Sequence, residues 1–187
     1  MDKNMNRKNW GRSILPVATA LLVMGFAISA FAQEAGLPGG ATSLREGHGG
    51  WTVSCNITTQ NGAAAKACAL SQEQTDAQSR QRVLAIELRP NGETVQGTLV
   101  LPFGLALDQG VKLQIDDGAA LPPLRFRTCL PGGCLVDLSF EGDTLAALRN
   151  GTSLKVKVVA DGGEETNLAL SLKGFPSALD RTAALLK

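Results

Sequence analysis

Residues 84–101 read LAIELRPNGETVQGTLVL, and this stretch decides the fold. Leu84, Ile86 and Leu88 alternate with small or charged residues, so an extended segment would have one apolar face and one polar face. The turn signal Pro-Asn-Gly follows at 90–92, and a second run of β-prone residues comes after it. The stretch therefore predicts two antiparallel strands joined by a short turn.

The same alternation recurs in other parts of the chain. Residues 111–116, 153–159 and 166–173 each place apolar side chains on one face of an extended segment. We therefore predict an all-β fold of about nine or ten short strands, either an antiparallel β-sandwich or a partly closed barrel. The expected strands are 51–55, 67–72, 82–89, 94–101, 111–116, 124–129, 134–140, 153–159 and 166–173, with 104–107 as a tenth candidate.

Two helices are expected within this β pattern. Asp143 can cap a short helix near 143–149, which the pair Asn-Gly at 150–151 would end. The tail over 177–186 carries apolar residues on one side of a helix. We expect this C-terminal helix to pack on the sheet or cover one of its edges.

The first 32 residues have the three parts of a signal peptide. A basic start precedes an uncharged apolar run over 14–28, and Ala30 and Ala32 then supply small residues at the −3 and −1 positions. We predict cleavage before Gln33. The apolar run is shorter than the roughly 20 residues that cross a bilayer, so a retained membrane anchor is the less favoured alternative.

Behind the leader we predict a flexible N-terminal segment over 33–50 and a single β-rich domain over 51–187. The segment is rich in glycine and shows little periodicity. The chain's one histidine, His48, falls in it. We therefore expect a solvated linker histidine and not a partner in a Ser–His or Cys–His site.

Composition excludes some classes of function. The leader holds four of the 18 basic and one of the 17 acidic residues, which leaves 14 basic and 16 acidic residues and a net charge of −2. This net charge is not the strongly positive charge that is typical of nucleic-acid-binding proteins. No second apolar run is long enough for a transmembrane helix in the mature chain. The chain has no Tyr, and Trp51 is the only Trp after the leader, which disfavours a sugar-stacking site.

The four cysteines are the strongest site signal. Cys55, Cys68, Cys129 and Cys134 permit three pairings, and local geometry favours Cys55–Cys68 and Cys129–Cys134 across two short reversals. A four-thiolate zinc site is a less favoured alternative, because cysteines of exported proteins form disulfides. A redox-active pair is also less favoured, because catalytic dithiols typically have a two-residue spacer.

Charged residues supply only weak candidates for a further site. Arg125 and Arg127 share one strand face, while Arg80, Arg82 and Arg89 lie elsewhere. An anion-binding patch for lipid headgroups or acidic glycans is one interpretation of them. A solvated sheet face with scattered ion pairs is the favoured interpretation.

The acidic residues do not show the spacing of a metal site. Asp116-Asp117 favours a hairpin reversal, and Asp161 with Glu164-Glu165 lacks the loop pattern of a calcium site. We therefore predict no catalytic, cofactor-binding or metal-binding residue, and no cofactor.

Five short motifs, in order along the chain, resemble those of the invasion-associated locus B (IalB) family of bacterial exported proteins. The resemblance implies an exported β-rich domain in a bacterial envelope, linked by its name to host-cell invasion. The resemblance does not imply an enzyme, and it supplies no catalytic residue that could be assigned to a position in this chain. The motifs are Trp51-Thr52-Val53-Ser54-Cys55, Cys68-Ala69-Leu70-Ser71-Gln72, Leu101-Pro102-Phe103-Gly104-Leu105-Ala106-Leu107, Cys129 with Gly133-Cys134, and Leu172-Lys173-Gly174-Phe175.

The leading hypothesis is a non-enzymatic, exported binding protein whose partner is an unknown macromolecule of the envelope or the host surface. It would be periplasmic or associated with the outer membrane or cell surface. One alternative is an envelope hydrolase with carboxylates from separate strands. Another is an envelope-maintenance or stress factor with no role in a host.

Overall fold

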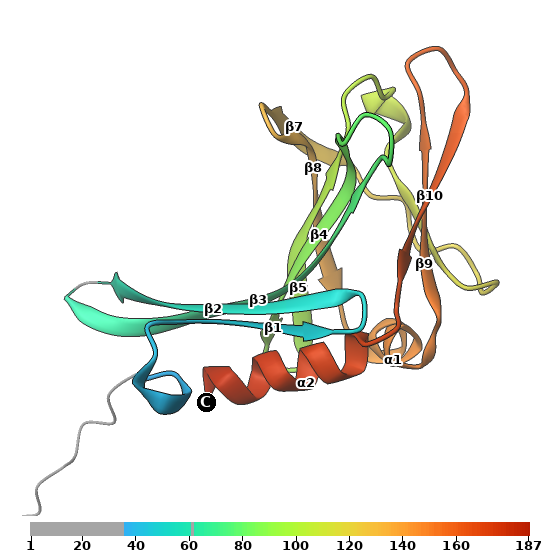
Figure 1. The fold of residues 1–187 in the computed structure, drawn as a ribbon. Helices are drawn as coiled ribbons and strands as arrows, with labels where there is room; N and C mark the ends of the chain where they lie inside the picture. Colours follow the sequence, from blue (N-terminus) through green and yellow to red (C-terminus); the bar gives the residue numbers. More distant parts are fainter. Residues whose placement is uncertain (1–35, 61) are drawn as a thin grey trace, which may run out of the picture. The chain divides into compact units, whose positions relative to one another are not determined.

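The structure is a computed structural model that describes residues 36–60 and 62–187, so the predicted leader lies outside the described residues. Ten strands, two α-helices and two short 3-10 turns form in this part of the chain (Figure 1). The strands are β1 (Ser43–His48), β2 (Trp51–Gln60), β3 (Ala63–Thr75), β4 (Arg82–Asn91), β5 (Thr94–Leu101), β6 (Lys112–Ile115), β7 (Phe126–Leu130), β8 (Gly133–Phe140), β9 (Ser153–Val159) and β10 (Glu165–Ser171). The helices are α1 (Gly142–Asn150) and α2 (Phe175–Leu186), and the 3-10 turns are η1 (Pro38–Gly40) and η2 (Leu107–Gln109).

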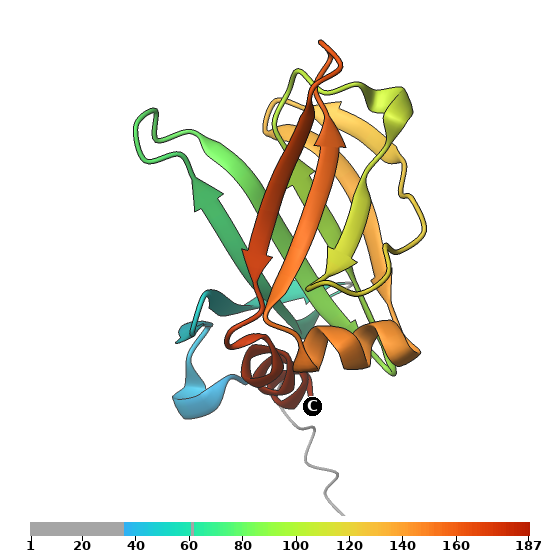
Figure 2. The ribbon, with the colours of Figure 1, turned by 90° about the vertical axis from the view of Figure 1, so that its right-hand side faces the viewer.

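The strands form two antiparallel sheets. Seven strands pair in the order β1-β2-β3-β4-β5-β8-β7, and three pair in the order β10-β9-β6. Figure 2 shows the three-stranded sheet in front of strands of the larger one. The predicted all-β class and the nine predicted strands over 51–173 are confirmed, with shifts at their ends.

The two sheets are joined by hydrogen bonds at both sides. The fold therefore combines features of the predicted sandwich and of the predicted partly closed barrel. Val111, just before β6, exchanges two backbone hydrogen bonds of 2.9 Å with Leu124, just before β7. On the other side, side chains of β3 reach the backbone of β10: Gln72 contacts Ser171, and Gln74 donates to the carbonyl oxygen of Ala169.

The core lies between the sheets and beneath α2. Leu84, Ile86 and Leu88, which alternate in the deciding stretch, are all buried as predicted. Helix α2 contacts β1, β2, β3 and β4 (Figure 1). Its Phe175 ring lies 5.1 Å from the Trp51 ring, measured between centroids, at a tilted angle. The predicted C-terminal helix therefore forms and covers the sheet through its apolar stripe.

The prediction of a flexible segment over 33–50 was wrong for residues 43–48, which form β1 and pair with β2 along their whole length. Leu37, further upstream, is buried in the core. Glu46 of β1 pairs with Arg181 of α2, 135 residues away. The strand is thus held by distant partners, and its glycine-rich local sequence carries no signal for it.

Two smaller expectations also differ from the structure. The short helix begins at Gly142, with Glu141 at the capping position and no side-chain capping bond, so Asp143 lies inside the helix and does not cap it. Residues 104–107 do not form a strand. Leu105 makes a single bridge to Ala160, since the next residues turn into η2.

Candidate binding surface

Two disulfides link strands that are adjacent in the large sheet. Cys55 of β2 lies directly opposite Cys68 of β3, and Cys129 of β7 lies opposite Cys134 of β8. These are the pairs that local geometry favours in the sequence. The second disulfide closes a reversal of four residues, 130–133, and so holds the end of the β7–β8 hairpin in place.

The loop over 102–110 lies beside this hairpin end. Its middle is anchored by Leu105, which packs against the core, and by the Ala106 amide, which donates to the carbonyl oxygen of Val159 at 2.9 Å. Phe103 and Leu107, two residues to either side of Leu105, are exposed.

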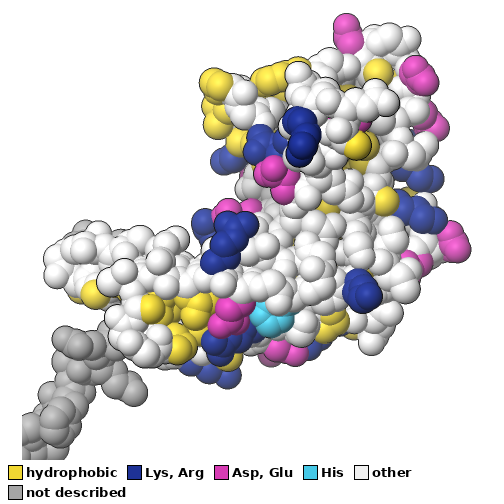
Figure 3. Space-filling model, viewed as in Figure 1, with side chains coloured by type: hydrophobic (Ala, Val, Ile, Leu, Met, Phe, Trp, Pro, Cys, Tyr) yellow, Lys and Arg dark blue, Asp and Glu magenta, His cyan; other side chains and the backbone are white. Residues whose placement is uncertain are grey.

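Three of the four large hydrophobic side chains exposed in the described chain belong to these two elements. Phe103 is 60% exposed, Leu130 52% and Leu107 48%, while the fourth, Leu186, lies at the C-terminus and is 36% exposed. Figure 3 shows hydrophobic side chains gathered around the end of β7. Exposed apolar groups that gather in one place are typical of interaction sites.

Two hollows lie between the loop and the β7–β8 hairpin. One, of about 520 Å³, lies between Phe103, Pro131 and Arg82. The other, of about 380 Å³, lies between Leu107 and residues 125–128 at the start of β7. Phe103 and Leu107 thus each border a recess.

Arginines flank the apolar residues, as the blue side chains below them in Figure 3 illustrate. Arg82 donates to the carbonyl oxygen of Gly132 in the hairpin turn and lies 3.7 Å from Glu73. Arg127 pairs with Asp137 at 3.2 Å, and Arg125 has no ion-pair partner among the described residues. We call Phe103, Leu107, Leu130, Arg82, Arg125 and Arg127 the tip surface.

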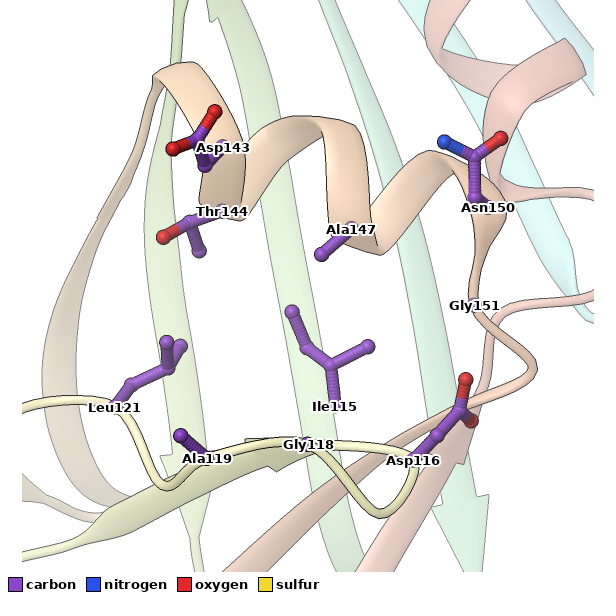
Figure 4. A pocket seen from close by; sticks show the side chains of 10 residues that line it. All are labelled: Ile115, Asp116, Gly118, Ala119, Leu121, Asp143, Thr144, Ala147, Asn150 and Gly151. Carbon is purple, nitrogen blue, oxygen red and sulfur yellow. The ribbon is translucent and has the colours of Figure 1, made fainter.

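The structure also contains a groove of about 460 Å³ between α1 and the segment over 115–121 (Figure 4). Ile115 and Leu121 point toward the helix, and Asp116 and Asp143 lie at opposite ends. An acid–base pair of carboxylates would have to face one substrate bond. This arrangement does not place the two groups against each other.

Asp116 has a structural role in this groove. Its carboxylate accepts hydrogen bonds from the Thr152 hydroxyl, the Thr152 amide and the Ser153 amide, at 2.6 to 3.1 Å. These bonds, led by that of the hydroxyl, lower the pKa of Asp116. The group therefore ties the end of β6 to the start of β9 as a carboxylate and is unsuited to donating a proton.

His48 does not lie in a solvated linker. Its Nδ1 atom is 3.3 Å from the Ser177 hydroxyl, and its Nε2 atom is 3.5 Å from Glu46. The arrangement contains the residue types of a hydrolytic triad, but the Ser177 hydroxyl donates to the carbonyl oxygen of Gly174, and Glu46 is held by two hydrogen bonds from Arg181. We interpret the cluster as a clamp between β1 and α2.

Other acidic candidates also have ordinary roles. Asp117 pairs with Lys155 at 2.7 Å, and Asp161 donates its amide to the carbonyl oxygen of Gly104. Within residues 36–60 and 62–187, no group of three or more His, Cys, Asp or Glu residues is placed to hold a metal ion. No helix of this described part is long and apolar enough for a membrane span.

Sequence reasoning identified Arg125 and Arg127 but not the apolar residues beside them. The sequence singles out Phe103 and Leu107 only as parts of a family motif, and it does not single out Leu130. Their common exposure depends on Leu105 and the hairpin disulfide, which lie in separate parts of the chain. The one local sequence signal for this surface is Phe103, a large apolar residue that directly follows Pro102 at the end of β5.

These features define the class: a two-sheet β protein with two cross-strand disulfides and an exposed apolar tip flanked by arginines. Within that class, the chain belongs to the invasion associated locus B (IalB) protein family, whose family model matches residues 51–183. This finding agrees with the resemblance read from the motifs. The family is not a known enzyme family.

Similar proteins support this membership. An invasion protein B homologue of Brucella abortus (strain 2308) is 48% identical over 162 residues, which cover 86% of this chain and 90% of that protein. Invasion protein B of Bartonella bacilliformis is 34% identical over 190 residues, covering 94% and 100%. The crystal structure of invasion associated protein B from Bartonella henselae matches with a TM-score of 0.69 and 35% identity, covering 76% of this chain and 96% of that one.

Proposed function

We propose that this protein is an exported, non-enzymatic interaction protein of the bacterial envelope that binds another macromolecule through the tip surface. The observation that carries the proposal is the gathering of Phe103, Leu107 and Leu130 at one end, on elements held by a disulfide and by core contacts. Large apolar side chains anchored on rigid elements supply most of the binding energy of protein interfaces.

Export is supported by two independent features. The first 32 residues have the pattern of a cleaved signal peptide. The described cysteines are all paired, and disulfides persist in oxidising compartments such as the periplasm and the cell surface. The relatives are named for invasion, so a contribution to host-cell entry is part of the proposal.

A competing function, hydrolysis by strand-borne carboxylates, has less support. A general acid needs a carboxyl group whose pKa is raised toward neutrality. Asp116, which lines the groove of about 460 Å³ beside α1, has its pKa lowered by hydrogen bonds. The groove therefore favours a structural interpretation of its carboxylates.

Site-specific photo-crosslinking in cells tests the proposed function. A photoreactive phenylalanine analogue at position 103 or 130 should capture a specific macromolecule. The same analogue at position 186 is the matched control, because Leu186 is exposed but outside the tip surface. Equal capture from all three positions, or none from the tip positions, would overturn the proposal.

The same partner should then be lost in tip variants. Phe103→Ser and Leu130→Ser should each weaken capture by about tenfold or more, because each removes an apolar anchor, while Leu186→Ser should not. A protease site and an epitope tag after Lys187 would establish location. Cleavage in intact cells indicates surface exposure, and cleavage only after outer-membrane permeabilisation indicates a periplasmic protein.

A further inference from the structure

We infer that the outer edge of β7 is a strand-addition site for an extended, acidic segment of a protein partner. The inference rests on the proposed function and specifies the chemistry of the partner at the tip surface. It follows from the sheet topology, the recess beside β7, the arginines on and just before the strand, and the apolar residues at its end and across the recess.

The first observation is that β7 ends the seven-stranded sheet. β8 lies on one side of it, and the backbone–backbone hydrogen bonds of β7 within the described chain run to β8 alone. The other edge opens onto the hollow of about 380 Å³ that also contacts Leu107, Asp108 and Gly110. A sheet edge beside a recess offers amide and carbonyl groups to an incoming strand.

The β7 edge is fixed in its extended conformation before any partner strand binds. The Cys129–Cys134 disulfide fixes one end of β7 to β8, and the Val111–Leu124 bonds fix the chain just before its other end. A register shift between Phe126 and Thr128 sets Arg127 apart from the regular ladder. The ordering cost of binding therefore falls on the partner segment and not on β7.

The charges on β7 and just before it select among possible partner strands. Arg125 and Arg127 are exposed, and Arg125 has no ion-pair partner in the described chain. Pairing β7 with β7 of a second copy would bring arginines together, and like charges across strands are destabilising. A segment with carboxylates would instead form charge-assisted hydrogen bonds with Arg125 and would compete with Asp137 for Arg127.

Apolar residues complete the recognition pattern. Leu130 lies at one end of the edge and Leu107 across the recess, both about half exposed. The side chains of an extended partner alternate between two faces. We therefore expect a segment in which carboxylates alternate with branched apolar residues.

A synthetic peptide of alternating glutamate and valine, about eight residues long so that it spans a typical strand, is the probe. Its binding to the disulfide-bonded protein can be measured by fluorescence anisotropy. The matched peptide with lysine in place of glutamate should bind about tenfold more weakly or worse. The double variant Arg125→Glu/Arg127→Glu should reverse this preference, with circular dichroism confirming that it is folded.

A third peptide separates strand addition from simple charge attraction. It keeps the glutamates but carries N-methyl groups on alternate amides, which removes hydrogen-bond donors along one edge of the peptide. We expect its binding to fall by about tenfold, since backbone hydrogen bonds supply the affinity in strand addition. Equal binding of the methylated peptide, or no binding of the glutamate peptide, would overturn the inference.

The inference and the proposed function can fail separately. If the probe does not bind but Phe103→Ser still abolishes partner capture, strand addition is wrong and the proposed function stands. If the probe binds with the expected charge preference but tip variants capture the partner normally, the edge site stands and the proposed function is wrong.

Discussion

The side-chain amide of Gln72 pairs with the backbone of Ser171 as a neighbouring strand would. Its Nε2 donates to the carbonyl oxygen of Ser171 at 2.9 Å, and its Oε1 accepts from the Ser171 amide at 3.0 Å. Gln72 is a buried polar residue on β3, and Ser171 is the last residue of β10. Gln72 therefore links β3 of the large sheet to the edge strand β10 of the small sheet, where no backbone ladder connects them.

Replacing Gln72 by leucine should destabilise the protein by about 2 kcal/mol. The substitution removes both bonds and leaves the Ser171 amide without its partner beside the core, while the Ser171 carbonyl oxygen keeps its hydrogen bond from the Trp51 indole. Urea denaturation measures the change in the free energy of unfolding. Gln74→Ala is the control, because Gln74 makes one bond to Ala169 at a more exposed position and should cost about half as much or less. A Gln72→Leu variant as stable as the native protein would contradict the conclusion that Gln72 holds β3 and β10 together.

Gly97→Ala should cost about 1–3 kcal/mol, although glycine is normally unfavourable in a strand. A Cβ atom at Gly97 of β5 would meet the carbonyl oxygen of Glu87 and the Leu88 side chain on β4. Gly47→Ala is the matched control in β1, where a Cβ atom meets nothing within 4 Å, and should change stability by less than about 0.5 kcal/mol. Thermal and urea unfolding of both variants check the difference, and equal effects would be inconsistent with a close approach of β4 and β5.

Removing the two disulfides should have unequal effects. The Cys55–Cys68 pair is separated by 13 residues in sequence and the Cys129–Cys134 pair by 5. By loop-closure entropy, Cys55→Ala/Cys68→Ala should cost about 3 kcal/mol and Cys129→Ala/Cys134→Ala about 2 kcal/mol. Denaturant unfolding of each double variant under non-reducing conditions tests the order. A larger loss for the shorter loop would show that the second disulfide contributes more than chain entropy.

Stability should fall in acid partly through Glu46. Two hydrogen bonds of 2.7 Å from Arg181 hold the pKa of this carboxyl below its ordinary value of 4.5. A lowered folded-state pKa contributes stability that is present above the unfolded value and is lost as pH falls through the folded value. Glu46→Gln lacks this contribution at every pH.

The melting temperatures of the native protein and Glu46→Gln should therefore differ most near neutral pH. The difference should shrink as pH falls below 4.5, where the unfolded-state carboxyl takes up its proton, and should vanish below the lower pKa of the folded state. Asp76 and Asp116, whose pKa values are also lowered by hydrogen bonds, make the variant itself acid-sensitive. A difference that stays constant from neutral pH to acid would argue against a folded-state ion pair.

How well a strand can be predicted from the sequence depends on how far along the chain its stabilising partners lie. Over 84–89 in β4 and 153–158 in β9, large apolar residues alternate with small, polar or charged ones, so each strand is predictable from its own sequence. β1 has no such pattern, because its partners Trp51, Arg181 and Ser177 come from other elements. The helix over 142–150 was predicted, but its start was misplaced, since Asp143 was assigned a cap that no side chain forms.

The sequence by itself determined the all-β class, nine of the ten strands, the cysteine pairs and the family. Each of these depends on local alternation, short reversals or motifs in order, which are properties of neighbouring residues. Only the tertiary structure decided how the sheets close through Gln72, why β1 forms, and where the tip surface lies. Those features depend on contacts between residues up to 135 positions apart, and no local pattern encodes such pairings.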